Sequence, residues 1–505
     1  MIKRLLVGLM QWICVATLLG QESLASAVKT SARRFNVLLL VDDQHRGDWL
    51  GAAGASWMIT PNLDLLAHEG VLFRRAYTST PSCLPARAAL LTGMSPWGHG
   101  CLGYVKIPAH YQFEKPRVFT EAGWRTYVVG KNHYDPPDNL HGYETGALGD
   151  SNSTSTNYWE WFLAQAPGRK PNQGSRSSND QRGGIIYPFA EELHRTTWTT
   201  ARALEFLEGY KQDRPWFLKI SFCIRIRPSI LWRAGCSATK GWISPQISSV
   251  NGHGKTGEIF TGRCSMTPTR SVVSSRSANC RPCADPMPRR FLRWTIGRIL
   301  AAVEKRGELE NTFILFTSDH GDMMGDHLLY RKTYPYEGSV RVPMILRWPS
   351  SLRLDARRGQ LREELTELRD VLPTLLDAAG LPKPAAVEGM SLLDILRGKP
   401  GRTRLDLEHA SCYQPKDGWV ALMDQRFKYI YFVHTGQQQL FDLQQDPNEL
   451  QDLAGQPRHA TLVKELREKM RVHLQVRGEP WVRNGDLAIQ NKAVKRRTNN
   501  PNVRE

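Results

Sequence analysis

The chain has 505 residues, which is too long for one ordinary hydrophobic core, so we expect one large domain and a smaller one. Hydrophobic residues make up 41% of the sequence, a content that excludes a largely disordered protein. The net charge of +18 does not indicate a nucleic-acid partner, because nine of those charges come from residues 223–292 alone.

The first 27 residues have the pattern of a secretory signal peptide. Lys3 and Arg4 form a basic start, residues 5–19 are apolar, and residues 25–27 are small, as at a cleavage site. The apolar run is too short to span a bilayer with any margin, and no later stretch is long enough. We therefore expect an exported protein, periplasmic or secreted, without a membrane span after cleavage.

Two apolar runs predict strands that are buried on both faces of a parallel sheet. Residues 35–41 end in Asp42 and Asp43, and residues 311–318 end in Asp319 and His320. Ligands gather at the carboxyl ends of such strands. Adjacent carboxylates repel each other, and a hard cation commonly holds them together. The alternative for Asp42 and Asp43 is an ordinary acidic turn.

Cys83 precedes a predicted helix in the stretch from Pro81 to Arg87, which leads into the apolar residues 88–93. Pro85 suits a first helical turn. A side chain at that position faces unpaired backbone N–H groups and the positive end of the helix dipole, a setting that favours anions, and Arg87 adds a fixed charge. The alternative is a buried structural cysteine.

Lys131 and His133 follow a short predicted strand at residues 126–129. Two residues apart, their side chains project to the same side if the backbone is extended. This would bring a lysine and a histidine together at the end of a strand. The alternative is a solvated lysine beside an unrelated histidine.

Taken together, these motifs resemble those of type I sulfatases. The Cys-x-Pro-x-Arg pattern at Cys83 is similar to the sulfatase signature, and residues 60–67 and 130–133 match further family elements. Lys332, followed by Glu337 and the stretch 341–343, continues the likeness.

The resemblance implies an α/β fold, an alkaline-phosphatase-like sandwich with a large mixed, mostly parallel sheet over residues 28–400. A smaller C-terminal α+β subdomain should occupy residues 401–485, where the alternating runs 419–423 and 427–432 predict hairpins. A closing helix there should bury one face. The residues of that face are Val463, Leu466, Met470 and Leu474. The polar, basic tail at 486–505 is expected to be disordered.

The resemblance also implies the cofactors. A formylglycine-generating enzyme would oxidise Cys83 to formylglycine, and the site would hold one divalent metal, Ca²⁺. The implied metal ligands are Asp42, Asp43, residue 83, Asp319 and His320. His320 stands where the family often has asparagine, which leaves another metal open.

The implied reaction is the hydrolysis of a sulfate ester on a small molecule or a carbohydrate. Hydrated formylglycine would attack sulfur through one hydroxyl and release the alcohol, leaving a covalent sulfate ester. Arg87 and Lys131 would orient the hydrate, and Lys332 would bind sulfate. His133 would deprotonate the second hydroxyl, expelling sulfate and restoring the aldehyde.

Residues 223–293 break every pattern expected of the family. The segment is rich in Arg, Ser and Cys, and Cys280 with Cys283 lacks a second pair at zinc-ligand spacing. Read two bases later, the codons from Cys223 onward can spell His-Pro-His-Ser-Pro-Phe-Asp, the sequence expected at this place. We interpret the segment as a compensated frameshift; the alternative is a divergent insertion.

As written, the chain lacks the family's leaving-group histidine. We therefore expect weak or no activity, above all on alkyl sulfates, because general acid help is typically worth about 10²–10⁴-fold. Two alternatives to a sulfatase stay open: a phosphonate or phosphate monoester hydrolase of the same superfamily, and an inactive exported remnant.

Overall fold

The computed structural model describes residues 35–150, 154–172, 185–225, 230–231 and 287–504. The expected signal peptide at 1–27 lies outside these residues, as does most of the anomalous block at 223–293. Regular structure nevertheless enters both margins of that block, since strand β7 extends to Arg225 and helix α8 begins at Met287.

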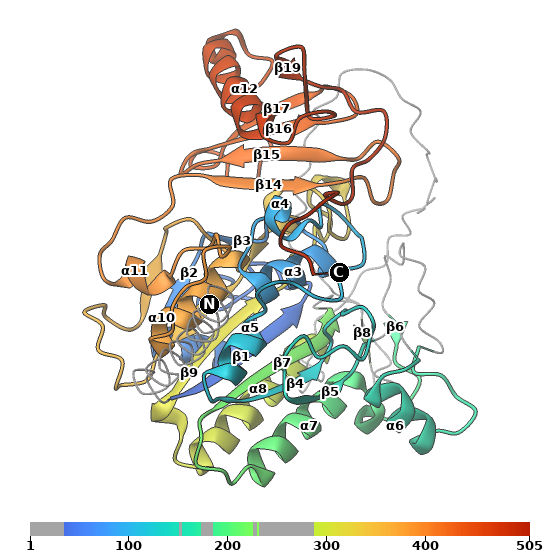
Figure 1. The fold of residues 1–505 in the computed structure, drawn as a ribbon, viewed down its shortest axis with the longest axis vertical. Coiled ribbons are helices and arrows are strands. Elements are labelled where there is room, and N and C mark those ends of the chain that lie inside the picture. The colour runs from blue at the N-terminus through green and yellow to red at the C-terminus, as the bar shows by residue number, and fades with distance from the viewer. Residues whose placement is uncertain (1–34, 151–153, 173–184, 226–229, 232–286, 505) are drawn as a thin grey trace, which may run out of the picture.

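An eight-stranded sheet forms the centre of the large domain, in the order β12-β2-β11-β9-β1-β7-β4-β5 (Figure 1). Its strands are β1 (Asn36–Asp43), β2 (Val71–Phe73), β4 (Arg125–Gly130), β5 (Thr145–Leu148), β7 (Trp216–Arg225), β9 (Thr312–Ser318), β11 (Met344–Arg347) and β12 (Gln360–Arg362). The neighbours β9, β1, β7, β4 and β5 run parallel, whereas β11 is antiparallel to β9 and to β2. The mixed, mostly parallel sheet predicted from the sequence is confirmed.

Helices cover both faces of this sheet because β1 is apolar from Val37 to Val41 and its side chains alternate between the faces. Val37, Leu39 and Val41 belong to one core and Leu38 and Leu40 to the other. The first core contains residues of α3 (Cys83–Thr92), α5 (Lys115–Glu121), α10 (Val371–Ala379) and α11 (Leu392–Leu396). The second contains residues of α2 (Pro61–His68), α6 (Asn157–Gln165), α7 (Arg195–Gly209) and α8 (Met287–Lys305).

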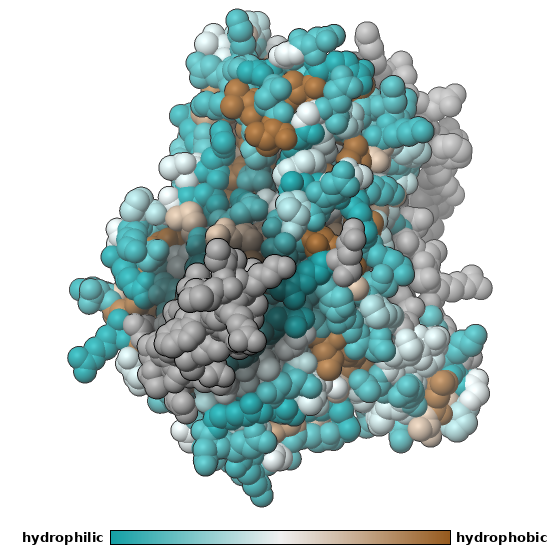
Figure 2. Space-filling model, in the orientation of Figure 1, coloured by the Kyte–Doolittle hydropathy of each residue, from teal (hydrophilic) through white to brown (hydrophobic). Residues whose placement is uncertain are grey.

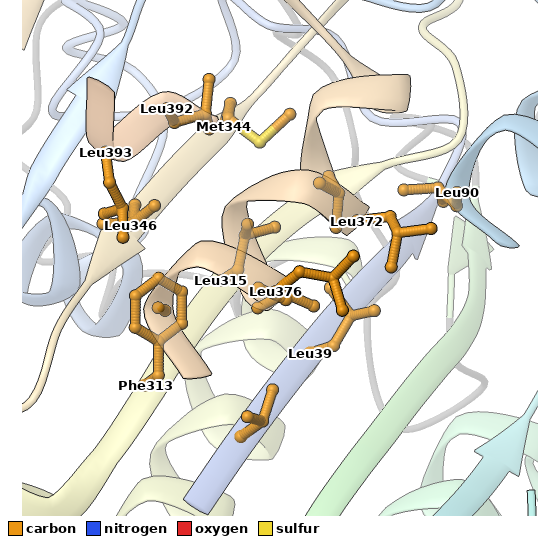
Figure 3. Packing of buried hydrophobic residues seen from close by; sticks show 14 of the residues in the cluster. Leu39, Leu90, Phe313, Leu315, Met344, Leu346, Leu372, Leu376, Leu392 and Leu393 are labelled. Carbon is orange, nitrogen blue, oxygen red and sulfur yellow. The ribbon is translucent and has the colours of Figure 1, made fainter. Parts of the chain in front are cut away.

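Figure 3 shows part of the first core, where Leu39 and Leu315 of the sheet face Leu372 and Leu376 of α10. All four side chains are almost fully buried. Burying an aliphatic side chain of this size contributes roughly 1.5–3 kcal/mol. The sandwich is therefore held by layers of aliphatic residues on each side of a sheet whose strand ends remain available for polar groups.

A second, antiparallel sheet lies beyond the carboxyl ends of the central strands (Figure 1). It consists of β14 (Leu405–His409), β15 (Trp419–Met423), β16 (Phe427–Phe432) and β17 (Gln438–Asp442), in that order. Helix α12 (Ala460–Gln475) packs on it through Leu466, Met470 and Leu474, which are buried as the periodicity predicts. Val463, expected on the same face, is partly buried.

The C-terminal tail differs from the sequence-based expectation. Instead of being disordered, residues 495–504 are packed against the loop that follows α4 (Pro96–His99), and the backbone N–H groups of Ala488 and Gln490 donate to the carbonyls of Trp481 and Val433. The backbone of Arg496 forms an isolated β-bridge with Cys101, and Val503 forms another with Tyr111. The composition of the tail does not reveal this packing, because only a few backbone hydrogen bonds and two valines anchor an otherwise polar segment.

The face of the molecule seen in Figure 2 is mainly hydrophilic, with apolar residues in small separate patches. Among the residues that the structure describes, no helix is both long and apolar enough to cross a bilayer.

Candidate active site

The two acidic strand ends lie side by side because β1 and β9 are adjacent, parallel strands with Asp42 opposite Ser318. Four potential ligand atoms, from Asp43, Cys83, Asp319 and His320, all lie within 4.8 Å of one another, and all four residues are buried. Two carboxylates and an imidazole are ligands suited to a divalent cation. The donor set therefore fits the metal that the sequence motifs imply.

Asp42 lies at the side of this group. Its Oδ2 is 3.1 Å from His45 Nδ1, and its Oδ1 accepts a hydrogen bond from the backbone N–H of Asp43. The structure thus brings four of the five predicted metal ligands together and pairs the fifth with His45, a residue the sequence analysis did not single out.

Cys83 is the first residue of α3, where the sequence placed a helix start. Ser82, in an extended conformation, precedes it. The Cys83 Sγ lies 2.8 Å from Lys332 Nζ, 3.3 Å from His320 Nε2 and 3.6 Å from Lys131 Nζ. Burial alone would raise the pKa of this thiol, but the charges of Lys131 and Lys332 outweigh burial and hold the pKa well below its ordinary value. The pocket therefore stabilises negative charge on residue 83.

Arg87 lies one turn further along α3 and is buried. Its guanidinium donates to Asp319 Oδ2 at 2.9 Å, to the carbonyl of Lys131 at 2.6 Å and to Ser221 Oγ at 2.8 Å. These contacts connect β7 with the residues that follow β4 and β9. Arg87 thus fixes a proposed metal ligand and the Lys131 loop.

The loop after β4 requires a glycine at its start. Gly130 has a φ of +89°, and a Cβ on it would lie 2.1 Å from the carbonyl oxygen of Ser221. This close approach turns the chain so that Lys131 Nζ reaches Asp43 Oδ1 at 2.9 Å. Lys131 is thereby held between a proposed metal ligand and Cys83.

His133 is held by its backbone, whose N–H donates to both carboxylate oxygens of Asp150 at 3.0 Å. Its ring Nε2 is 4.0 Å from Asp150 Oδ1, and neither ring nitrogen has a hydrogen-bond partner in the described part of the chain. The predicted general base is therefore half-buried and held next to Asp150 through its backbone.

Two residues of the C-terminal subdomain support the site and were missed from the sequence. His409 Nε2 is 2.9 Å from Ser82 Oγ, next to Cys83, and burial lowers the pKa of His409 to about 3, so its ring is neutral. Trp419 Nε1 donates to the carbonyl of Thr333 at 2.7 Å, next to Lys332. No short motif signals such contacts, because the partners are far apart in the sequence.

Comparisons with known proteins agree with this geometry. A family model described as Sulfatase matches residues 35–223, and one described as N-sulphoglucosamine sulphohydrolase, C-terminal, matches residues 325–476. The arylsulfatase of Clostridium perfringens is 33% identical to this chain, covering 88% of it and 95% of that protein. The N-acetylglucosamine-6-O-sulfatase of Bacteroides thetaiotaomicron is 23% identical, covering 89% of this chain and 88% of that protein.

Solved structures share the fold. The phosphonate monoester hydrolase from Silicibacter pomeroyi superposes with a TM-score of 0.66 at 21% identity, covering 90% of this chain and 99% of that one. At this identity the likeness establishes the fold, and it includes the C-terminal subdomain.

Proposed function

The chain belongs to the sulfatase family and is a sulfuric ester hydrolase; from this premise we propose that it cleaves sulfated carbohydrates or small sulfate esters at residue 83, in the formylglycine form. The arrangement of Cys83 carries the proposal. Two lysine ammonium groups lie within 3.6 Å of its Sγ, at the start of a helix and beside buried carboxylates. Such a pocket attracts an anion to the residue that is to react.

Formylglycine at position 83, made by a maturation enzyme, would supply a hydrated aldehyde as the nucleophile. Lys332 and Lys131 would bind the sulfate oxygens and stabilise the charge that develops on them. His133, whose ring nitrogens are not engaged by the residues that the structure describes, would accept the proton when sulfate departs. Arg87 would act by holding Asp319 and the Lys131 loop in place.

The residues that would hold the metal are Asp43, Asp319, His320 and residue 83, with Asp42 behind them. A hard cation there supplies positive charge beside the sulfate, and carboxylate-rich ligation favours Ca²⁺. His320 is the residue that bears on metal identity, because imidazole also suits softer divalent ions.

The experiment uses the full chain, made together with a formylglycine-generating enzyme, with nitrophenyl sulfate as substrate. Chelation should lower turnover by on the order of 10²–10³-fold, and Ca²⁺ should restore it. A nitrophenyl phosphate and a phosphonate monoester serve as comparison substrates. Faster turnover of either one would favour the superfamily alternative over a sulfatase.

The leaving group tests the altered block at 223–293. Nitrophenolate departs without much acid assistance, whereas an alkoxide needs it, so the chain as written should hydrolyse nitrophenyl sulfate and fail on an alkyl sulfate. Equal, family-typical rates on both substrates would refute the prediction that this chain lacks acid assistance to the leaving group. Resequencing the gene across codons 215–300 tests the frameshift itself.

The remnant alternative makes a different prediction. A chain that is damaged in its middle and inactive should keep an unmodified thiol at position 83 and melt without a cooperative transition.

We further propose export to the periplasm or the medium, on the strength of the pattern at residues 1–27. Fractionation of cells that express the full chain, with N-terminal sequencing of the product, tests this.

A further inference from the structure

Lys219 is a basic residue in the interior of the central sheet. It belongs to β7, which lies between β1 and β4 (Figure 1), and it is paired with Leu39 on one side and Val128 on the other. Its chain neighbours Leu218 and Ile220 are fully buried, and Lys219 itself is 2% exposed. Central strands of a parallel sheet normally carry apolar side chains, so a lysine here calls for a physical reason.

The described partners of its amino group are uncharged. Lys219 Nζ donates to Asn132 Oδ1 at 2.7 Å and to the Tyr134 hydroxyl at 3.3 Å. Burial, together with repulsion by Lys115 and Arg87, lowers the pKa of Lys219 well below its ordinary value. Whether charged or held neutral, an amino group in such surroundings costs stability relative to an apolar side chain of similar size. Stability alone therefore does not explain this lysine.

The side-chain amide of Asn132 connects Lys219 to the loop after β4. Its Nδ2 donates to the carbonyl of Gly130 at 3.1 Å. Because a carbonyl only accepts hydrogen bonds, Oδ1 is the atom that faces Lys219 Nζ. The bond from Asn132 to Gly130 closes a tight turn over the single residue between them, Lys131. Lys219 thus holds the amide in the orientation that closes the turn.

The closed turn determines where Lys131 points. The backbone N–H of Lys131 donates to the carbonyl of Ser221 at 2.9 Å, and its own carbonyl accepts from Arg87 at 2.6 Å. Its Nζ reaches Asp43 Oδ1 at 2.9 Å and Cys83 Sγ at 3.6 Å. Because Nζ is at the far end of a long side chain, a small rotation of the turn would move it away from both atoms.

Asp150 holds the other side of the same loop. Its carboxylate accepts the backbone N–H of Asn132 at 3.2 Å and that of His133 at 3.0 Å. Asn132 is therefore held through its backbone by Asp150 and through its side chain by Lys219. The two residues with proposed roles in the reaction, Lys131 and His133, lie on either side of this anchor.

We propose that Lys219 is a positioning residue for the sulfatase reaction, which acts through the amide of Asn132 to place the Lys131 ammonium beside residue 83. Lys219 itself contacts neither the substrate nor the reacting atoms. The inference rests on the proposed function, since it assumes that sulfate binds between Lys131 and residue 83. Under it, an amino group in the core is retained for the geometry of the site.

The test compares Lys219→Met with the wild type, both as the mature, metal-loaded full chain. Lys219→Met should lower kcat/KM for nitrophenyl sulfate about 10- to 100-fold, because Lys131 is displaced from the reacting centre. It should weaken the binding of inorganic sulfate, measured by calorimetry, about three- to tenfold. The melting temperature should stay within a few degrees, because methionine fills similar space without an amino group to bury.

Lys115→Met is the matched control. Lys115 of α5 is 1% exposed, its Nζ lies 6.0 Å from the ring centroid of Phe217 in the same core, and it donates to the carbonyl of Leu90 at 2.8 Å. This hydrogen bond leads to the later half of α3 rather than to the loop after β4. Lys115→Met should change kcat/KM and sulfate affinity by less than about twofold. Equal kinetic losses in the two variants would overturn the role assigned to Lys219.

A double-mutant cycle tests the route through the amide. Asn132→Ala should cause a loss similar to that of Lys219→Met, and the double variant should lose at most about twofold more, because both changes break one contact. Losses that multiply would show that Lys219 does not act through Asn132 and would overturn the proposal. If Lys219→Met does not fold, Asn132→Ala decides, since wild-type kinetics in that variant would equally overturn it.

The positioning role and the proposed function fail in different ways. Wild-type turnover and sulfate binding that are unchanged in Lys219→Met would overturn the positioning role and leave the proposed function standing. A wild type that neither hydrolyses nitrophenyl sulfate nor binds inorganic sulfate would overturn both. If the wild type binds sulfate without turnover, a loss of sulfate affinity in Lys219→Met supports the positioning role and an unchanged affinity overturns it.

Discussion

Two buried lysines have opposite surroundings, Lys332 at the start of the loop 332–337 and Lys428, which contacts the end of that loop. Lys428 of β16 donates to Glu449 at 2.6 Å, to Glu337 at 2.8 Å and to the carbonyl of Pro335 at 3.2 Å, which uses its three N–H donors. Lys332 instead lies 2.8 Å from Cys83 Sγ and 3.0 Å from His320 Nε2. The first lysine is paired with the carboxyl groups of Glu337 and Glu449, and the second faces Cys83, the proposed site of oxidation.

The difference shows how the molecule separates stability from function. A buried ammonium with two carboxylates holds the loop 332–337 on the C-terminal subdomain, and Trp419 holds Thr333 in the same loop. This arrangement lets Lys332 keep a position where its charge is available to a sulfate oxygen. The C-terminal sheet is therefore part of the active-site architecture, although its residues do not contact Cys83.

The largest expected effect comes from replacing Cys83, the residue that Lys332 faces. Cys83→Ser should abolish turnover of nitrophenyl sulfate, by on the order of 10⁴–10⁶-fold, because serine cannot become the aldehyde nucleophile and a removed nucleophile costs about that much in other hydrolases. Circular dichroism should show an unchanged fold. Cys101→Ser is the matched control, since that buried thiol contacts Tyr111 and His99 away from the pocket, and it should retain activity within a few-fold.

Lys428→Met tests the structural lysine. Removing it leaves the half-buried Glu337 and the buried Glu449 without their cation, so the free energy of unfolding should fall by about 3–5 kcal/mol at neutral pH. Urea denaturation measures this. Lys464→Met, at an exposed position on α12, should change stability by less than about 0.5 kcal/mol. Similar small losses in both variants would show that the buried cluster does not hold the loop.

Glu449→Gln tests the same cluster through pH. Burial, together with repulsion by Glu337, raises the pKa of Glu449 to about 7, although Lys428 opposes this. The folded state therefore holds a proton that the unfolded chain releases above its ordinary pKa of 4.5, so this carboxyl contributes stability below pH 4.5 that is lost as the pH rises through 7.

Glutamine mimics the protonated carboxyl. The wild type should therefore lose up to about 3 kcal/mol relative to Glu449→Gln between pH 4.5 and 7.5, at about 1.4 kcal/mol per pKa unit. Unfolding curves measured at several pH values give this difference. Parallel stability profiles for the two proteins would contradict it.

The smallest effect concerns the link between the two lysines. Trp419→Phe removes the hydrogen bond to Thr333, which should cost about 1 kcal/mol of stability and lower sulfate affinity and kcat/KM about threefold through displacement of Lys332. Tyr429→Phe removes a hydrogen bond to Gln438 in the same sheet and should cost similar stability with unchanged kinetics. Equal kinetic effects in the two variants would show that the Trp419 contact does not position Lys332.

Much of the fold was predictable from the sequence because local patterns decide it. The strands before Asp42 and Asp319 are continuous apolar runs, and β15 and β16 have the predicted bounds, since alternation and turn residues mark them. At the site, Cys83, Lys131 and Lys332 converge as the motifs predict.

The supporting residues were not predictable, because their partners come together only in three dimensions. Nothing near Lys428 in the sequence identifies Glu337 as its partner, although a lysine on an otherwise apolar strand is a signal that could have been followed. The tail was misjudged for the same reason, since its composition is polar and its anchoring contacts with residues 98–112 are distant in the sequence.

The central claim is that residue 83 functions as an oxidised cysteine beside a divalent cation. Mass spectrometry of the peptide containing residue 83, with metal analysis of the same folded sample made alongside a formylglycine-generating enzyme, tests it most directly. The account predicts an aldehyde in place of the thiol and one bound divalent ion per chain. A folded sample with an intact thiol and no bound metal would contradict it.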